Sequence, residues 1–106
     1  MEITEKVYTV TKKLPKEEMY SLTNQIRRAA VSIPSNIAEG HSRNSKKEYI
    51  QFLSFAHGSK AELETQVLLC VKIGYLNEDD ITEIMSLLTE VGKMLFVLID
   101  KLGSRD

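Results

Sequence analysis

The chain has 106 residues, and 42% of them are hydrophobic, which is enough for one core and a single domain over residues 1–106. Two prolines, five glycines and no tryptophan leave few of the turn signals that a β-sandwich or β-barrel needs, so the composition favours long helices. The net charge is −1, but residues 1–60 carry ten Lys and Arg against six Asp and Glu, whereas residues 61–106 carry four against nine, which predicts a basic and an acidic part on one surface.

The first predicted helix covers Glu2–Lys13, where apolar residues recur at helical spacing, and Pro15 ends it. Ser21 is a suitable N-cap for a second helix, whose apolar stripe continues until just before Gly40. Pro34 interrupts this stripe, because a proline removes one backbone hydrogen bond and clashes with the carbonyl four residues earlier. We expect one helix kinked at Pro34, and two shorter helices are the alternative.

A polar loop is expected from Gly40 to Asn44. Ser45 and Glu48 then form a capping box, in which each side chain accepts a hydrogen bond from the free backbone amide of the other. The third helix therefore begins at Ser45 and continues to Gly74, a length of about 28 residues or about 42 Å.

The fourth helix is predicted from its two ends. Asn77 can cap it, three acidic residues at 78–80 follow in its first turn, and Lys101 lies near its end, so both ends suit the helix dipole. Its apolar residues alternate at three- and four-residue spacing, as in bundle cores. Together the four elements predict an all-α fold, an antiparallel up-down four-helix bundle.

The third and fourth helices carry more apolar residues than one core-facing stripe needs. The surplus consists of Phe55, Leu68, Val71, Leu87, Met94 and Val97. A wide core face on a central helix would explain it, but in a small bundle such a surplus favours a subunit interface. We therefore expect a homo-oligomer.

The sequence shows no constellation typical of catalysis, a metal or a cofactor. A di-metal bundle centre needs Glu-x-x-His pairs, and His41 and His57 are preceded three residues earlier by Ala38 and Ser54. Cys70 lies on an apolar stripe, where a cysteine usually serves packing, and no glycine-rich phosphate loop is present. We expect no enzyme activity, no metal and no cofactor.

The sequence also bears on location. A single cysteine excludes an intramolecular disulfide, and the first residues, MEITEKVY, lack the apolar stretch of a signal peptide. The longest apolar run, Met94–Ile99, is far shorter than the roughly 20 residues that cross a bilayer. A cytoplasmic protein without a membrane span is expected.

Basic residues gather in the second helix and in the loop after it. They are Arg27, Arg28, Arg43, Lys46 and Lys47. Guanidinium and ammonium groups suit contact with the phosphates of RNA or DNA, although a solvated loop is the ordinary explanation of such a cluster. The sequence pI of about 6.1 argues against strong binding by one copy, whereas a ring would align several copies of the same basic surface.

Three segments carry a resemblance to a known family. They are Leu22–Gly40, Ser45–Tyr49 and Gly58–Gln66, and the similarity extends into the fourth helix. They closely resemble the four-helix-bundle proteins encoded in intervening sequences of bacterial 23S rRNA genes, and they are similar to the accessory variability proteins of diversity-generating retroelements. The resemblance implies a ring-shaped homo-oligomer, with a pentamer favoured, and for the retroelement proteins it implies binding to nucleic acid and a reverse transcriptase. Family members usually have a longer first helix with a tryptophan, which this chain lacks, so the packing of the first helix stays open.

The most characteristic stretch of this resemblance surrounds Pro34. It contains Ser32, Asn36 and Glu39, whose spacings of four and three place them on one helical face. They would form a shared polar site or an oligomer contact, or they would satisfy backbone groups freed by the proline, which is the interpretation that we favour.

Two functions follow as hypotheses. The first is a non-catalytic, oligomeric protein of the intervening-sequence type that binds RNA or other nucleic acid through its basic surface. The second is a protein–protein adaptor or scaffold that recruits a partner protein through the surplus apolar faces of the third and fourth helices. Solution mass separates them, because a ring would bury those faces and a monomer would leave them open.

Overall fold

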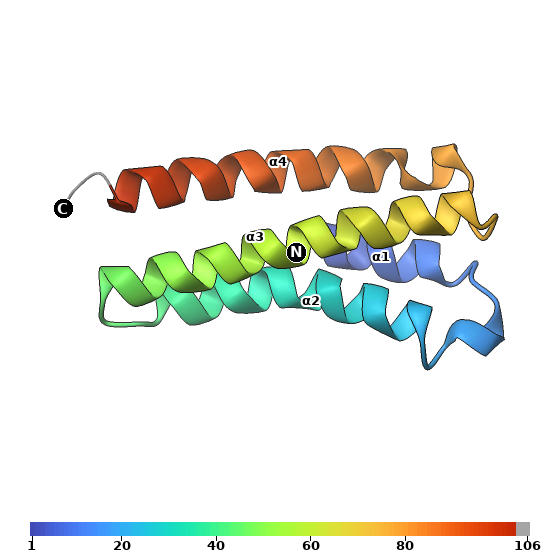
Figure 1. Cartoon of the computed structure of the whole chain (residues 1–106), viewed down its shortest axis with the longest axis horizontal. Coiled ribbons are helices and arrows are strands. Elements are labelled where there is room, and N and C mark those ends of the chain that lie inside the picture. Colours follow the sequence, from blue (N-terminus) through green and yellow to red (C-terminus); the bar gives the residue numbers. More distant parts are fainter. Residues whose placement is uncertain (104–106) are drawn as a thin grey trace.

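The structure is a computed structural model that describes residues 1–103. It consists of α1 (Glu2–Thr11), the short 3-10 helix η1 (Lys16–Glu18), α2 (Leu22–His41), α3 (Lys46–Lys72) and α4 (Glu78–Gly103). Successive α-helices run in opposite directions, and α3 lies between α2 and α4 (Figure 1). The predicted all-α, antiparallel up-down four-helix bundle is confirmed. The first helix ends two residues earlier than predicted, because Lys12–Leu14 form a tight turn with i to i−3 hydrogen bonds.

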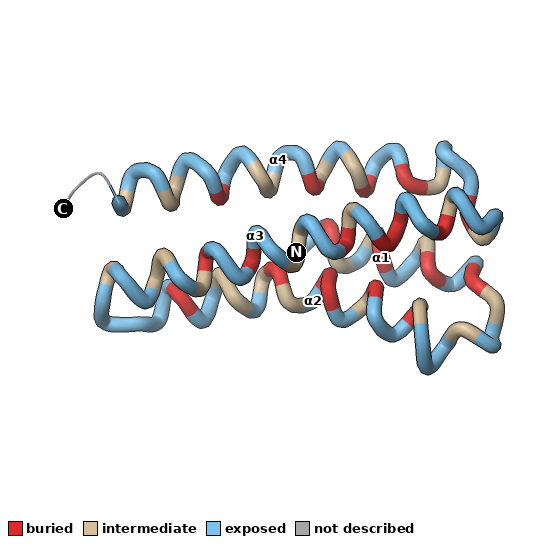
Figure 2. Tube along the Cα trace, in the orientation of Figure 1, coloured by how far each residue is buried: buried red, intermediate tan, exposed pale blue. Residues whose placement is uncertain are grey.

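The core is concentrated in the half of the bundle that α1 covers. With ten residues, α1 is much shorter than α3, which has 27. Most buried apolar residues therefore belong to one cluster where all four helices meet, and in Figure 2 they gather toward the end of the bundle that contains α1. A second, smaller cluster in the other half has three buried members among residues 1–103, namely Leu53, Ala56 and Leu95. The half beyond α1 is thus built from three helices.

Pro34 lies inside a continuous α2, so the alternative of two shorter helices is wrong. A proline at position 34 leaves the carbonyl of Ala30 without its usual helical amide donor. In the structure, the Thr4 hydroxyl of α1 donates a hydrogen bond to this carbonyl over 3.4 Å. Packing of α1 therefore supplies a partner for the backbone group that Pro34 frees.

Gly40 was expected to begin the loop after the second helix, and this expectation is wrong. The helix continues through Gly40 to His41, and Gly40 is buried. A β-carbon at this position would lie 2.9 Å from the β-carbon of Phe52 and 3.2 Å from the backbone oxygen of Tyr49. The glycine therefore serves the close approach of α2 and α3 rather than a turn. At Gly74, by contrast, φ is +89°, as expected for a glycine that ends a helix.

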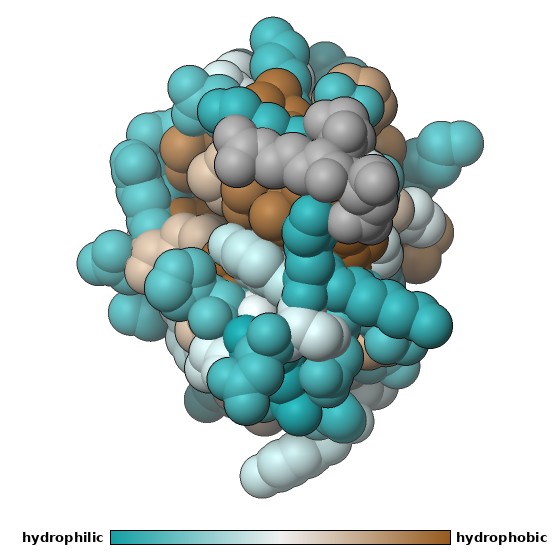
Figure 3. Space-filling model, turned by 90° about the vertical axis from the view of Figure 1, so that its left-hand side faces the viewer, coloured by the Kyte–Doolittle hydropathy of each residue, from teal (hydrophilic) through white to brown (hydrophobic). Residues whose placement is uncertain are grey.

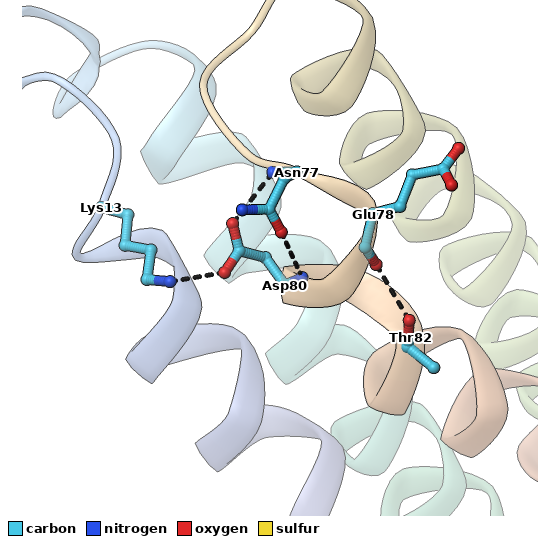
Figure 4. Close-up of polar contacts among 5 residues, drawn as sticks. All are labelled: Lys13, Asn77, Glu78, Asp80 and Thr82. Atoms are coloured by element: carbon cyan, nitrogen blue, oxygen red, sulfur yellow. Dashed lines mark hydrogen bonds and ion pairs between the residues drawn. The ribbon is translucent and has the colours of Figure 1, made fainter.

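The start of α4 is held by a reciprocal capping box (Figure 4). The Asn77 side chain accepts a hydrogen bond from the Asp80 amide, and the Asp80 carboxylate accepts one from the Asn77 amide, both over 2.9 Å. The same carboxylate pairs with Lys13, just after α1. The Lys13 ammonium, followed by the Asn77 amide, lowers the pKa of Asp80 below its ordinary value. This box therefore also fixes the chain after α1 to α4.

At the start of α3 the predicted capping box forms only in part. Ser45 Oγ accepts a hydrogen bond from the Glu48 amide over 3.0 Å, as predicted. The Glu48 carboxylate, however, accepts a hydrogen bond from the Ser45 hydroxyl over 3.3 Å, where the prediction placed the Ser45 amide. Glu48 is thereby turned toward the loop, where it also meets Arg43.

Candidate nucleic-acid interface

The structure separates the predicted basic residues into two groups. Arg27 and Arg28 lie near the start of α2, whereas Arg43, Lys46 and Lys47 lie at the connection between α2 and α3. At 1.5 Å per residue, Arg28 lies about 20 Å along α2 from the end of the helix at His41, two residues before Arg43. Figure 3 views the molecule from the end that contains this connection. Hydrophilic side chains cover the lower part of this view, and hydrophobic ones are exposed above them, nearer to α4. The basic residues therefore form two groups rather than one patch.

The two arginines of the first group have different surroundings. Arg27 is half-buried, and its Nε donates a hydrogen bond to Thr11 Oγ1 over 2.9 Å. Its guanidinium lies 4.7 Å from the centre of the Tyr8 ring, so Arg27 joins α2 to α1. Arg28 is exposed beside it. A phosphate reaches Arg28 more easily than Arg27.

Nearby carboxylates partly neutralise the second group. Arg43 pairs with Glu39 over 2.8 Å and lies 3.7 Å from a carboxylate oxygen of Glu48. Its guanidinium also lies 4.8 Å from the centre of the Phe52 ring. Lys46 is half-buried and Lys47 is exposed. The net positive charge at the connection is thus smaller than the sequence suggests.

The polar residues around Pro34 do not form one cluster. Asn36 donates hydrogen bonds to the Ser32 carbonyl over 2.8 Å and to its hydroxyl over 2.9 Å. The Ser32 hydroxyl also lies 2.8 Å from that of Ser59 in α3. Glu39 instead pairs with Arg43. The structure brings Ser32 and Asn36 together with Ser59 and directs Glu39 toward the connection.

Sequence reasoning missed Ser59, although a signal for it exists. Ala56, Leu63 and Gln66 are buried, and Ser59 is three residues after the first of them and four before the second. A polar residue in such a column is expected to face a polar partner on the neighbouring helix, which here is Ser32.

Five polar side chains recur along one face of α2 and just beyond its end. Arg28, Ser32, Asn36, Glu39 and Arg43 follow one another at spacings of four, four, three and four, which places them on one helical face and its extension into the connection. We call these five residues the α2 stripe. It runs from Arg28 in the first basic group to Arg43 in the second.

Two shallow grooves flank the first part of the α2 stripe and share Arg28 and Ser32. One, of about 360 Å³, lies toward α3 and is also lined by Gln25, Ala29 and Glu62. The other, of about 490 Å³, lies toward α1 and is also lined by Tyr8, Asn24, Arg27 and Val31. The amide side chains and the tyrosine in these linings were not singled out by the sequence pattern, because only the packing of α1 and α3 against α2 shows that they border the stripe.

The sequence model of the 23S rRNA-intervening sequence protein family matches residues 1–97. The chain belongs to this family. The chain is also similar to a solved structure, that of a protein of unknown function from the S23 ribosomal protein family of Bacteroides thetaiotaomicron VPI-5482. The TM-score is 0.84, the sequences are 25% identical, and the match covers 92% of each chain. No curated protein matches the sequence.

The surplus apolar residues of α3 and α4 divide into two kinds. Val71 and Leu87 are half-buried against the main core. Four others, Phe55, Leu68, Met94 and Val97, are exposed. Phe96, which the sequence pattern did not single out, is 69% exposed beside a groove of about 510 Å³ between α3 and α4. The second half of α4 thus presents an apolar surface.

Three further observations concern the described part of the chain. Among residues 1–103, no cluster of His, Cys, Asp and Glu is arranged to hold a metal ion. Burial, followed by the charge of Glu18, raises the pKa of the Cys70 thiol and so disfavours a reactive thiolate. None of the helices in this range is long and apolar enough to cross a bilayer.

Proposed function

We propose that this chain is a cytoplasmic, non-catalytic homo-oligomer that binds RNA along the α2 stripe. The observation that carries the proposal is the stripe itself, in which an exposed arginine lies about 20 Å along α2 from the helix end that precedes a second basic group, with Ser32, Asn36 and Glu39 between them. Arginine, serine and asparagine side chains are common donors to phosphate oxygens and sugars. A strand of several nucleotides lying along α2 would meet both groups at once.

The charge balance supports an assembly rather than a single copy as the binding unit. Glu39 and Glu48 offset Arg43, and the net charge of the chain is −1, so one stripe would hold RNA weakly. Several stripes on one oligomer would act together, because after the first contact the others form at a high effective concentration.

The exposed apolar surface of α3 and α4 supports self-association. No α-carbon of α2 lies within 8 Å of one in α4 in the described part of the chain, because α3 separates them. Contacts through Met94, Phe96 and Val97 would therefore leave the α2 stripe accessible. Analytical ultracentrifugation should give a mass several times that of the chain, and the resemblance to retroelement accessory proteins favours five copies. A monomer at micromolar concentration would contradict this part of the proposal.

RNA binding is tested by removing positive charge from the α2 stripe and from the connection between α2 and α3. The variant Arg28→Gln/Arg43→Gln/Lys47→Gln should bind a structured RNA at least about tenfold more weakly near 0.1 M salt. The slope of log affinity against log salt should also become shallower, by up to about one for each phosphate that the variant no longer neutralises. Fluorescence anisotropy over a salt series measures both quantities.

The matched control changes the same charge elsewhere. Lys12, Lys16 and Lys72 are exposed on other segments, and replacing all three by glutamine removes three positive charges outside the stripe. This control should retain most of the affinity. The site assignment is wrong if the two variants bind RNA equally weakly, or if the stripe variant binds like the wild type.

The apolar surface also supports a second candidate function, a protein–protein adaptor. Phe96 is more exposed than Val97, the other large hydrophobic residue that lines the groove between α3 and α4, and a hydrophobic side chain of a partner protein would gain contact area there. A monomeric chain that leaves this groove open and does not bind RNA would favour the adaptor.

A further inference from the structure

The groove between α1 and α2 has features of a nucleotide-binding site. Resting on the proposed function, we infer that one unpaired nucleotide of the bound strand docks there, with its base against the Arg27–Tyr8 pair and its phosphate at Arg28. The inference narrows the ligand from nucleic acid in general to segments with unstacked bases.

The Arg27–Tyr8 pair is already positioned in the structure. Thr11 Oγ1 donates a hydrogen bond to the Val7 carbonyl over 2.8 Å and accepts one from Arg27 Nε over 2.9 Å. Thr11 is buried and holds Arg27 Nε, and Arg27 Cζ lies 4.7 Å from the centre of the Tyr8 ring. Nucleobases stack on aromatic rings and on guanidinium planes. A base that stacks on this pair would therefore meet an Arg27 side chain that Thr11 already holds.

The rest of the groove supplies the polar contacts that a nucleotide needs. Exposed Asn24 offers a donor and an acceptor for a base edge or a sugar, and exposed Arg28 offers a guanidinium for phosphate. Among the described residues, the lining contains two arginines and no carboxylate, in contrast to the neighbouring groove, which contains Glu62. The volume of about 490 Å³ lies within the range of about 300–1,000 Å³ that is usual for small-ligand sites.

The same features argue against a duplex as the ligand of this groove. Bases in a duplex are stacked on both faces, so none of them can reach a protein side chain without leaving the helix. Because Arg28 also borders the groove toward α3, the phosphate at Arg28 would lead the next nucleotide onto the α2 stripe. The unpaired nucleotide would thus occupy one end of the proposed binding path.

The test compares a single-stranded oligonucleotide with a duplex of the same sequence, each made as RNA and as DNA so that the preferred sugar is identified. Tyr8→Leu should weaken single-strand binding about tenfold, because base–ring stacking makes a large contribution to such binding. It should leave duplex binding within about twofold of the wild type. Tyr8→Phe should keep single-strand affinity, because it retains the ring. Tyr20→Leu is the matched control, since Tyr20 is 94% exposed and does not line the groove, and it should change neither affinity.

A second readout does not depend on the folding of a variant. In wild-type protein, the fluorescence of 2-aminopurine in the single strand should change at saturation as that base docks beside Tyr8. An unchanged signal at every probe position would overturn the inference. So would a folded Tyr8→Leu variant with wild-type affinity for single strands. If Tyr8→Leu has no effect and the triple stripe variant still binds more weakly, the nucleotide site fails and the proposed function stands. If the wild type binds no oligonucleotide, both fail.

Discussion

Replacing Leu88 with alanine is expected to lower the free energy of unfolding by about 3–5 kcal/mol, near the upper end of the values for a buried leucine. Leu88 is fully buried in α4 and belongs to the main core cluster, where all four helices meet. Truncation there removes apolar contacts and leaves a cavity that helices on every side prevent from collapsing. Urea denaturation followed by circular dichroism, at one fixed protein concentration, measures the change.

Leu95 provides the comparison for Leu88. It lies two turns further along α4 and is also fully buried, but its cluster has only two other buried members. Half-buried neighbours in a three-helix layer can move into the space that Leu95→Ala leaves. We expect a loss nearer to about 2–3 kcal/mol. A loss as large as that of Leu88→Ala would contradict the uneven core described above.

Gly40→Ala should destabilise the protein by about 1–2 kcal/mol, although alanine is the better helix former. The added β-carbon would come within 2.9 Å of Phe52 Cβ and 3.2 Å of the Tyr49 backbone oxygen. Neither atom is the end of a flexible side chain, so α2 and α3 would have to separate. Overpacking of this kind costs about 1–3 kcal/mol, which exceeds the gain in helix propensity of about 0.5–1 kcal/mol. Thermal and urea unfolding measure the net effect.

Gly58→Ala is the matched control for Gly40→Ala. Gly58 lies in the interior of α3, and a β-carbon there would have no heavy atom within 4 Å. Only helix propensity then changes, so this variant should gain about 0.5–1 kcal/mol. Opposite signs for the two variants would support close approach as the role of Gly40. Equal stabilisation by both would show that the backbones of α2 and α3 are further apart than described.

Sequence periodicity predicted most of the fold, because long amphipathic helices encode their own boundaries and core faces. The Gly74 terminus and the four helices were found from local patterns alone. Gly40 was misassigned because a glycine that ends a helix and one that permits close packing have the same local sequence. The difference lies in Tyr49 and Phe52, which come from the next helix.

The candidate site was predictable to a smaller extent. The basic residues were found by composition, but the burial of Arg27 depends on Thr11 and Tyr8, which α1 brings from a distant part of the sequence. The neutralisation of Arg43 by Glu39 follows a spacing of four and could have been inferred from the sequence. The grooves beside Arg28 could not, because each requires the packing of two helices.

Ultraviolet cross-linking of the wild-type oligomer to RNA, with mass spectrometry of the linked peptides, tests the central claim most directly. If RNA lies along the α2 stripe, the linked peptides should come from residues 22–47, with further links at Tyr8. Links confined to the second half of α4, between residues 93 and 101, would show that RNA binds the apolar surface instead and would contradict the account.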